Sequence, residues 1–216
     1  MLQVGAARLN AQTKGDDKYG PANEKKSGKL PAYTAALADR AAKAFSMRRW
    51  DEARTAYLEM LEADSTNALV LSNLGAVEQG AGHLPKAKEY FGKAVAINPD
   101  LTQAWLAWGL VCYDLGDNYL AASALTRAID QAPTDAKAHN YLAVAVQKLG
   151  WLDAAESELR RAIELDPNYA NANYNLALMY LDRKPPAVEL AKHHYERAVA
   201  LGAAKDPDVE KRLQEK

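Results

Sequence analysis

The chain has 216 residues, of which 49% are hydrophobic and 25% charged, a composition typical of a globular protein. Its 27 Lys and Arg residues against 28 Asp and Glu residues give a net charge of -1, which argues against nucleic-acid binding. Cys112 is the only cysteine, so an intrachain disulfide and a multi-cysteine zinc site are excluded. No apolar run approaches the roughly 18 residues of a membrane-spanning helix, so we expect no insertion into a membrane.

Residues 1–33 form a segment whose Lys and Arg residues outnumber its Asp and Glu residues and whose glycines divide it into short pieces. We expect a weakly structured basic leader or linker here, with at most a short helix near 2–12. The segment lacks the basic start and unbroken apolar centre of a signal peptide, so a cytoplasmic location is expected. If a leader has been removed, the protein would instead be periplasmic or secreted.

From residue 34 onward the sequence repeats itself with a period of 34 residues. An alanine and a large apolar residue four positions later keep this spacing, as does a proline near the end of repeats two to four. Self-similarity at so many positions predicts an array of repeated structural elements. The three series are Ala53, Ala87, Ala121 and Ala155; Tyr57, Phe91, Leu125 and Leu159; and Pro99, Pro133 and Pro167.

Each repeat has the pattern of two helices joined by a turn. In the fourth repeat, Leu142, Val146 and Leu149 are spaced by four and three residues, as on one helical face. Gly150 follows where a helix end favours left-handed backbone, and Pro167 ends the second helix. A helix pair this short cannot bury both of its faces alone, so neighbouring repeats must stack. We therefore predict an all-α fold, an α-solenoid of helix-turn-helix repeats.

The repeats resemble the tetratricopeptide repeat, whose pattern is W-x2-L-G-x2-Y followed by A-x3-F, A and P. The third repeat carries Trp105-x2-Trp108-Gly109-x2-Cys112. The resemblance implies a right-handed solenoid of five repeats over 34–203. These repeats span 34–67, 68–101, 102–135, 136–169 and 170–203.

The C-terminal part departs from the strict period in two places. Ala191 follows Ala155 by 36 residues, two more than the period, and Pro185 and Pro186 forbid helix before it, so we predict a longer turn at 182–186. Further on, Asp206 followed by Pro207 is typical of a helix N-cap and first position. We therefore predict a capping helix over 206–216 with a charged outer face.

The sequence contains no recognisable reactive cluster. Cys112 stands where the family carries a tyrosine, and we interpret it as a buried, inert thiol. His193 and His194 are adjacent on a helix, so they point about 100° apart and cannot share a metal ion. No phosphate-binding loop, nucleophile elbow or HExxH zinc motif occurs. We therefore expect no catalytic residue, no metal and no cofactor, and we do not expect an enzyme.

The resemblance also implies a concave groove lined by the first helix of each repeat. In repeats three to five, the residues at the inward positions combine an apolar centre with amides, tyrosines and lysines. Such a surface suits a peptide or helix, because amides bind backbone groups whatever the side chains are. Leu106 and Leu110 have a second interpretation, packing between adjacent repeats. The predicted partner-binding residues are Gln103, Leu106, Leu110, Tyr113, Lys137, Asn140, Val144, Gln147, Lys148, Asn171, Tyr174, Asn175 and Leu178.

Trp151 lies in a turn between helices, a place that is usually polar. We interpret it either as packing over the neighbouring turn or as an edge anchor for a partner. The lysine and asparagines with which one subfamily binds the terminal carboxylate of chaperones have no counterparts at the matching positions.

The leading hypothesis is a non-enzymatic interaction module, or scaffold, that binds a peptide or helix of a partner protein in the groove. A second hypothesis is a structural scaffold in which Trp151 and the segment 1–33 join copies of the chain into a homo-oligomer. A third is the partner-selecting repeat region of a larger enzyme, such as a transferase. None of the three involves a nucleic acid or a membrane.

Overall fold

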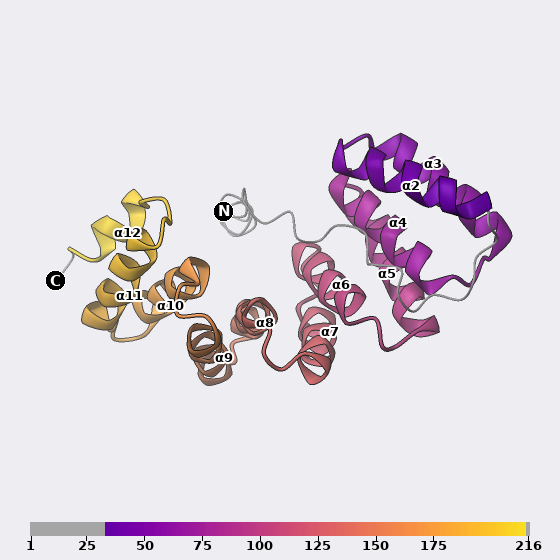
Figure 1. The fold of residues 1–216 in the computed structure, drawn as a ribbon. Coiled ribbons are helices and arrows are strands. Elements are labelled where there is room, and N and C mark those ends of the chain that lie inside the picture. The colour runs from indigo at the N-terminus through magenta and orange to yellow at the C-terminus, as the bar shows by residue number, and fades with distance from the viewer. Residues whose placement is uncertain (1–32, 215–216) are drawn as a thin grey trace. The chain divides into compact units, whose positions relative to one another are not determined.

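The structure is a computed structural model that describes residues 33–214 (Figure 1). The described residues leave out 1–32 of the predicted leader, including its expected short helix near 2–12. They also leave out residues 215–216 of the predicted capping segment. Every regular element across 33–214 is an α-helix, which confirms the predicted all-α fold. The chain divides after Gln131 into two compact units, an N-terminal unit (33–131) and a C-terminal unit (132–214).

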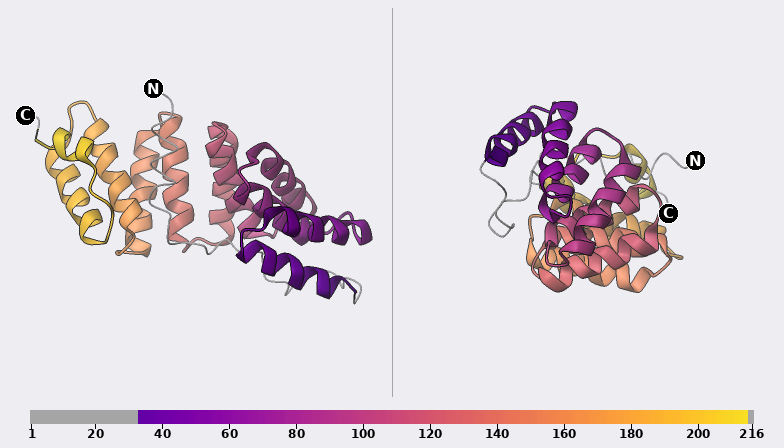
Figure 2. Two further views of the ribbon diagram at one scale, coloured as in Figure 1. Left: turned by 90° about the horizontal axis from the view of Figure 1, so that it is seen from above. Right: turned by 90° about the vertical axis from the view of Figure 1, so that its right-hand side faces the viewer.

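The N-terminal unit consists of three antiparallel helical hairpins, drawn in indigo to pink in Figures 1 and 2. The two helices of each hairpin pack together, α3 also packs on α4, and α5 packs on α6. The hairpins are α2 (Tyr33–Ser46) with α3 (Trp50–Ala63), α4 (Ala68–Gly80) with α5 (Leu84–Ile97), and α6 (Thr102–Asp114) with α7 (Asn118–Gln131).

The C-terminal unit consists of two such hairpins and a final short helix. Helix α9 packs on α10, so the second hairpin of this unit stacks on the first. The elements are α8 (Ala136–Lys148) with α9 (Leu152–Leu165), α10 (Ala170–Asp182) with α11 (Val188–Ala200), and α12 (Pro207–Arg212).

The alanines and large apolar residues that repeat in the sequence form the core of the hairpins. Tyr57, Phe91, Leu125 and Leu159 are all buried, as are the alanines four positions before them. In the second and third repeats, a glycine on the first helix faces this large apolar residue and lets the two helices come close. A Cβ on Gly75 would lie 2.7 Å from the Phe91 ring, nearer than side-chain atoms normally approach.

The turn inside each hairpin needs one residue in left-handed backbone. Gly82, Gly116 and Gly150 have φ values of 81°, 82° and 82°, which confirms the role expected of these glycines. The first repeat has Arg48 in this place, with φ of 56°. A side chain there meets steric resistance that glycine avoids, so the first turn is built at a cost to stability.

The two irregular C-terminal features are present, but the final helix, α12, ends at Arg212 and is shorter than the predicted 206–216. Helix α10 ends at Asp182 and α11 begins at Val188, so the predicted longer turn is present. The Asp206 side chain accepts hydrogen bonds from the backbone N–H groups of Asp208 (2.9 Å) and Val209 (3.3 Å) and thereby caps α12. Val209 is buried, which holds the short helix against the rest of the unit.

Candidate functional site

The predicted partner-binding residues of the N-terminal unit all lie on α6. Gln103 is exposed, and Leu110 and Tyr113 are half-buried, so these three are accessible on the helix. Leu106 is buried, which agrees with the alternative interpretation that it packs in the core. The surface that α6 offers is therefore narrower than the sequence suggested.

In the C-terminal unit, α8 and α10 carry the remaining predicted residues. Six of them are accessible: Lys148 is exposed, and Lys137, Gln147, Asn171, Asn175 and Leu178 are half-buried. Asn140, Val144 and Tyr174 are buried in the unit and offer little surface. The accessible set still mixes amides, lysines and one apolar side chain, the chemistry expected of a peptide-binding face.

Two of the predicted amides bind each other. Asn175 Nδ2 on α10 donates to Asn140 Oδ1 on α8 at 2.9 Å, so neighbouring first helices are linked directly. Asn140 is only 1% exposed, and its amide therefore contributes mainly to the stacking of the two hairpins. Asn175 remains half-buried and keeps part of its amide on the surface.

The buried Tyr174 bonds to the C-terminal segment. Its hydroxyl donates to Asp206 Oδ2 at 2.5 Å, and the backbone N–H of Asp206 donates to the Tyr195 hydroxyl at 2.7 Å. Tyr174 and Tyr195 also contact each other, with ring centroids 6.4 Å apart. Tyr174 thus fixes the start of α12 in place.

Asp114, at the end of α6, is a half-buried carboxylate next to Tyr113. Burial raises the pKa of the Asp114 carboxyl to about 6. Burial, and then the charge of Asp114, also raise the pKa of the Tyr113 hydroxyl. Both side chains are half-buried, so this end of α6 is partly shielded from water.

Trp151 is exposed, with 50% of its surface accessible. It directly precedes α9, and the next residue, Leu152, is 49% exposed. Two consecutive large apolar residues are therefore exposed at the start of α9. Whether Trp151 packs or anchors a partner stays a prediction.

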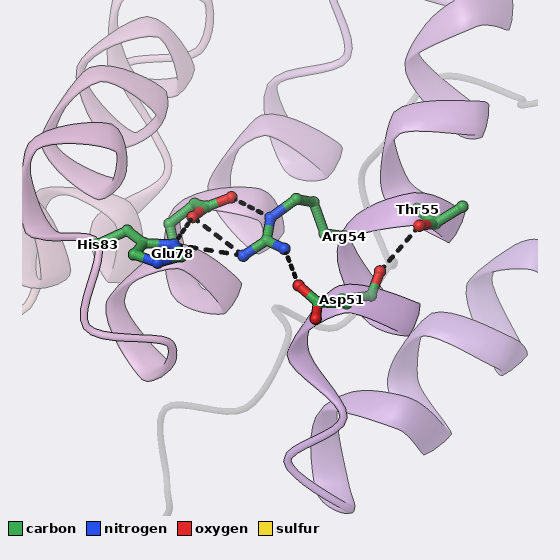
Figure 3. A network of polar contacts seen from close by, with 5 residues as sticks. All are labelled: Asp51, Arg54, Thr55, Glu78 and His83. Atoms are coloured by element: carbon green, nitrogen blue, oxygen red, sulfur yellow. Dashed lines mark hydrogen bonds and ion pairs between the residues drawn. The ribbon is translucent and has the colours of Figure 1, made fainter.

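A buried ionic cluster between α3 and α4 was missed by the sequence reasoning (Figure 3). Arg54 Nε donates to Glu78 Oε1 at 2.5 Å, and His83 Nδ1 lies 2.7 Å from Glu78 Oε2. Arg54 also pairs with Asp51. Burial alone would raise the pKa of the Glu78 carboxyl, but the hydrogen bonds from Arg54 and His83 outweigh it and hold this pKa below its ordinary value.

The same register joins other consecutive repeats within each unit. Lys88, 34 residues after Arg54, pairs with Asp117, which stands 34 residues after His83. In the C-terminal unit, Glu156 accepts a hydrogen bond from the Tyr180 hydroxyl at 2.9 Å and pairs with Arg183. The sequence signal was the polar Glu78 at a position where the family carries an aromatic residue. Because these contacts recur at stacking junctions, we assign them to stability.

The ionic cluster borders a surface cavity of about 530 Å³ in the N-terminal unit. Its lining combines cationic and acidic side chains around the indole of Trp50, and Arg54 and Asp51 already bind each other there. The lining residues are Arg48, Arg49, Trp50, Asp51, Glu52, Arg54, Ala81 and His83.

The residues that the sequence singled out for chemistry have ordinary environments. Cys112 is buried, and burial raises the pKa of its thiol to about 11, so the reactive thiolate is suppressed. His139 Nδ1 lies 2.6 Å from Glu158 Oε2, and His194 Nδ1 lies 3.0 Å from Asn173 Oδ1. Within 33–214, no group of three or more His, Cys, Asp or Glu side chains could hold a metal ion.

No helix in the described part of the chain combines the length and the apolar character needed to cross a bilayer.

Solved structures with a similar fold include two repeat proteins. MamA 41-end from Desulfovibrio magneticus RS-1 has a TM-score of 0.74 and 20% identity, with 80% of this chain and 97% of that chain covered. YrrB, described as a TPR protein with an unusual peptide-binding site, has a TM-score of 0.68 and 25% identity, with 86% and 97% covered.

Two curated relatives are transferases much longer than this chain. Human protein O-mannosyl-transferase TMTC3 is 29% identical over 154 residues, which is 69% of this chain and 17% of that protein. The probable UDP-N-acetylglucosamine–peptide N-acetylglucosaminyltransferase SPINDLY of Hordeum vulgare is 29% identical over 160 residues, 71% of this chain and 17% of that protein. The chain thus spans about a sixth of each.

Family models identify the repeats themselves. Models described as tetratricopeptide repeat match residues 72–136, 136–169 and 158–200. These ranges include the hairpins from α4 to α11, whose glycine turns and alanine contacts are described above. The chain belongs to the tetratricopeptide repeat family.

Proposed function

We propose that the chain is a non-enzymatic interaction module that holds a peptide or helix of a partner protein against the first helices of its repeats. The observation that carries the proposal is the accessible mixture on α6, α8 and α10. Amides, lysines and half-buried leucines occur together on these helices. Amides can bind a peptide backbone, and leucines can bury its apolar side chains.

The comparisons support a binding role without naming a ligand. YrrB, of similar fold and 25% identity, is described as having a peptide-binding site, which makes a peptide a reasonable class of ligand for this chain. The environment of Cys112 supports a non-enzymatic role, because burial keeps the thiol protonated.

A peptide-binding assay with surface variants tests the proposal. Peptides are selected from a random 12-residue phage library on the full chain, synthesised with a fluorophore, and titrated by anisotropy. Leu110→Asp and Leu178→Asp each place a charge on a first helix and are expected to weaken binding at least tenfold. Leu190→Asp is the matched control, because Leu190 is an exposed leucine on the second helix α11.

Circular dichroism of each variant checks that the helices remain folded. If the leucine variants on α6 and α10 bind as tightly as the control while retaining full helicity, the first helices are not the binding face. If the unaltered chain retains no peptide, the module does not bind peptides of this kind.

Self-association is a second candidate, favoured by the exposed neighbours Trp151 and Leu152. Large apolar side chains next to each other on a surface are typical of an interface. Light scattering at micromolar concentration tests it: a dimer that Trp151→Ala converts to monomer supports this role, and a monomer throughout contradicts it.

A third candidate is the repeat region of a larger transferase, favoured by the two transferase relatives of which the chain spans only 17%. In that case the repeats would select the partner or substrate and another domain would carry the chemistry. The mass of the native protein, detected with an antibody against the repeats, distinguishes a longer polypeptide from one of 216 residues.

A further inference from the structure

Asp114 ends α6 and presents a carboxylate that has no partner within its own unit. No hydrogen bond or ion pair from a described residue of that unit, 33–131, reaches this half-buried side chain. The last turn of α6 has no basic residue, and the C-terminal end of a helix carries partial negative charge. The local electrostatics therefore favour a cation, which the N-terminal unit does not supply.

Asp182 occupies the same repeat position on α10, two repeats later, and there the chain supplies the cation itself. Arg212 Nη2 of α12 donates to Asp182 Oδ1 at 2.7 Å. Six residues earlier, Asp206 accepts the hydrogen bond from Tyr174. The C-terminal segment 206–212 thus contacts α10 at the predicted partner-binding residue Tyr174 and at Asp182, and it binds the Asp182 carboxylate through an arginine.

We propose that Asp114 binds a Lys or Arg side chain of the partner segment, as Asp182 binds Arg212. This inference rests on the proposed function and names the partner's chemistry. An unpaired carboxylate at a helix C-terminus complements a cation in the same way that the Asp182–Arg212 pair does.

Leu110 adds a second requirement for the partner. It lies four residues before Asp114 on α6 and is half-buried, so the two side chains are about 6 Å apart along the helix. The partner segment therefore carries an apolar residue and a basic residue at matching separation. That separation is about two residues in an extended peptide or four in a helix.

Peptide selection on charge variants tests the inference. Random 12-residue peptides are selected on the full chain and on Asp114→Asn, which keeps the side-chain shape and removes its charge. Asp130→Asn is the matched control, since Asp130 is an exposed carboxylate on α7 of the same unit. Circular dichroism and melting temperature verify that both variants are folded.

Peptides selected on the unaltered chain are expected to share a Lys or Arg at one fixed position. Asp114→Asn should weaken their binding about tenfold or more, and Asp130→Asn should leave it unchanged. Replacing the shared basic residue of the peptide by norleucine should weaken its binding to the unaltered chain by the same factor. The same replacement should leave binding to Asp114→Asn almost unchanged. This loss of coupling identifies the contact.

The outcomes separate this inference from the proposed function. Peptides that lose binding to Leu110→Asp but bind Asp114→Asn normally would overturn the inference and leave the function standing. Peptides that bind both variants as tightly as they bind the unaltered chain would contradict both proposals. Selected sequences without any common basic position would also overturn the inference.

Discussion

Glu78 is the residue whose environment differs most from what its place in the repeat suggests. It is 1% exposed, on a helix whose other buried side chains are mostly apolar. A buried carboxylate is tolerated only when it is paired, and Arg54 and His83 provide the pairing. The stacking of the first two repeats therefore depends on a charge as well as on apolar packing.

Replacing Glu78 by Gln is expected to lower the free energy of unfolding by about 2 kcal/mol, because Arg54 loses its main buried partner. Urea denaturation at pH 7 measures the effect. Glu59→Gln breaks an exposed pair with Arg40 and serves as the control, with an expected change below about 0.5 kcal/mol.

The Glu78 effect should depend on pH in one direction. Because folding lowers the pKa of this carboxyl below its ordinary 4.5, its contribution is present above pH 4.5 and disappears as the pH falls through the folded-state pKa. The difference between Glu78→Gln and the unaltered chain should shrink below pH 4. A difference that grows on acidification would contradict the assignment.

Asp114 should show the opposite dependence. Its pKa rises on folding from 3.8 to about 6, so the ionised carboxylate destabilises the fold at neutral pH and less so as the pH falls through 6. Asp114→Asn is expected to raise the free energy of unfolding by about 1 kcal/mol at pH 7.5, after allowance for the carboxylate's exposed part. Thermal unfolding should show this gain disappear near pH 4; a loss of stability at pH 7.5 would contradict the account.

Register alone could not separate accessible from buried residues on the predicted face. Asn140 and Asn175 both belong to the predicted face, yet Asn140 is buried and accepts a hydrogen bond from Asn175, which stays half-buried. Tyr174 likewise bonds to Asp206, which is 32 residues away in the sequence. Contacts between residues this far apart leave no periodic signal.

At the scale of the helices, the sequence predicted most of the structure because each local signal agrees with the packing. The glycine turns, the series of buried alanines and the Asp206 cap all lie where the sequence placed them. The ionic contacts between repeats were not predicted, because the two residues of each pair come from different helices. Periodicity along one helix does not show which residues of another helix it will meet.

The close contact of α4 with α5 makes Gly75 sensitive to enlargement. Gly75→Ala is expected to lower the free energy of unfolding by about 1–3 kcal/mol, since its Cβ would meet the Phe91 ring at 2.7 Å. Phe91→Leu should restore part of the loss in the double variant, because the fourth repeat buries Ala143 and Leu159 at these two positions. Additive effects in denaturation experiments would show that the two side chains do not compete for space.

The attachment of α12 depends on Asp206. Asp206→Ala removes the N-cap and the acceptor for Tyr174 and is expected to cost about 1–2 kcal/mol. Lys211→Ala, an exposed change on the same helix, serves as the control and should alter stability little. Equal melting temperatures for the two variants would mean that α12 adds no stability to the C-terminal unit.

For the molecule as a whole, family and fold follow from the repeated sequence, whereas the ligand does not. The spacing of alanines, glycines and prolines records how helices pack, and packing is shared by every member of the family. The accessible side chains on α6, α8 and α10 are free of that constraint. Their mixture of amides, leucines and charges therefore carries the specificity, and only binding measurements can identify its partner.

Hydrogen–deuterium exchange of the full chain with a selected peptide, compared with the free chain, tests the central claim most directly. The account predicts that the peptide slows exchange in the first helices, with protection near Leu110 on α6 or near Leu178 on α10. It predicts little change in the second helices α5, α7 and α11. Protection confined to those second helices, with α6, α8 and α10 unaltered, would contradict it.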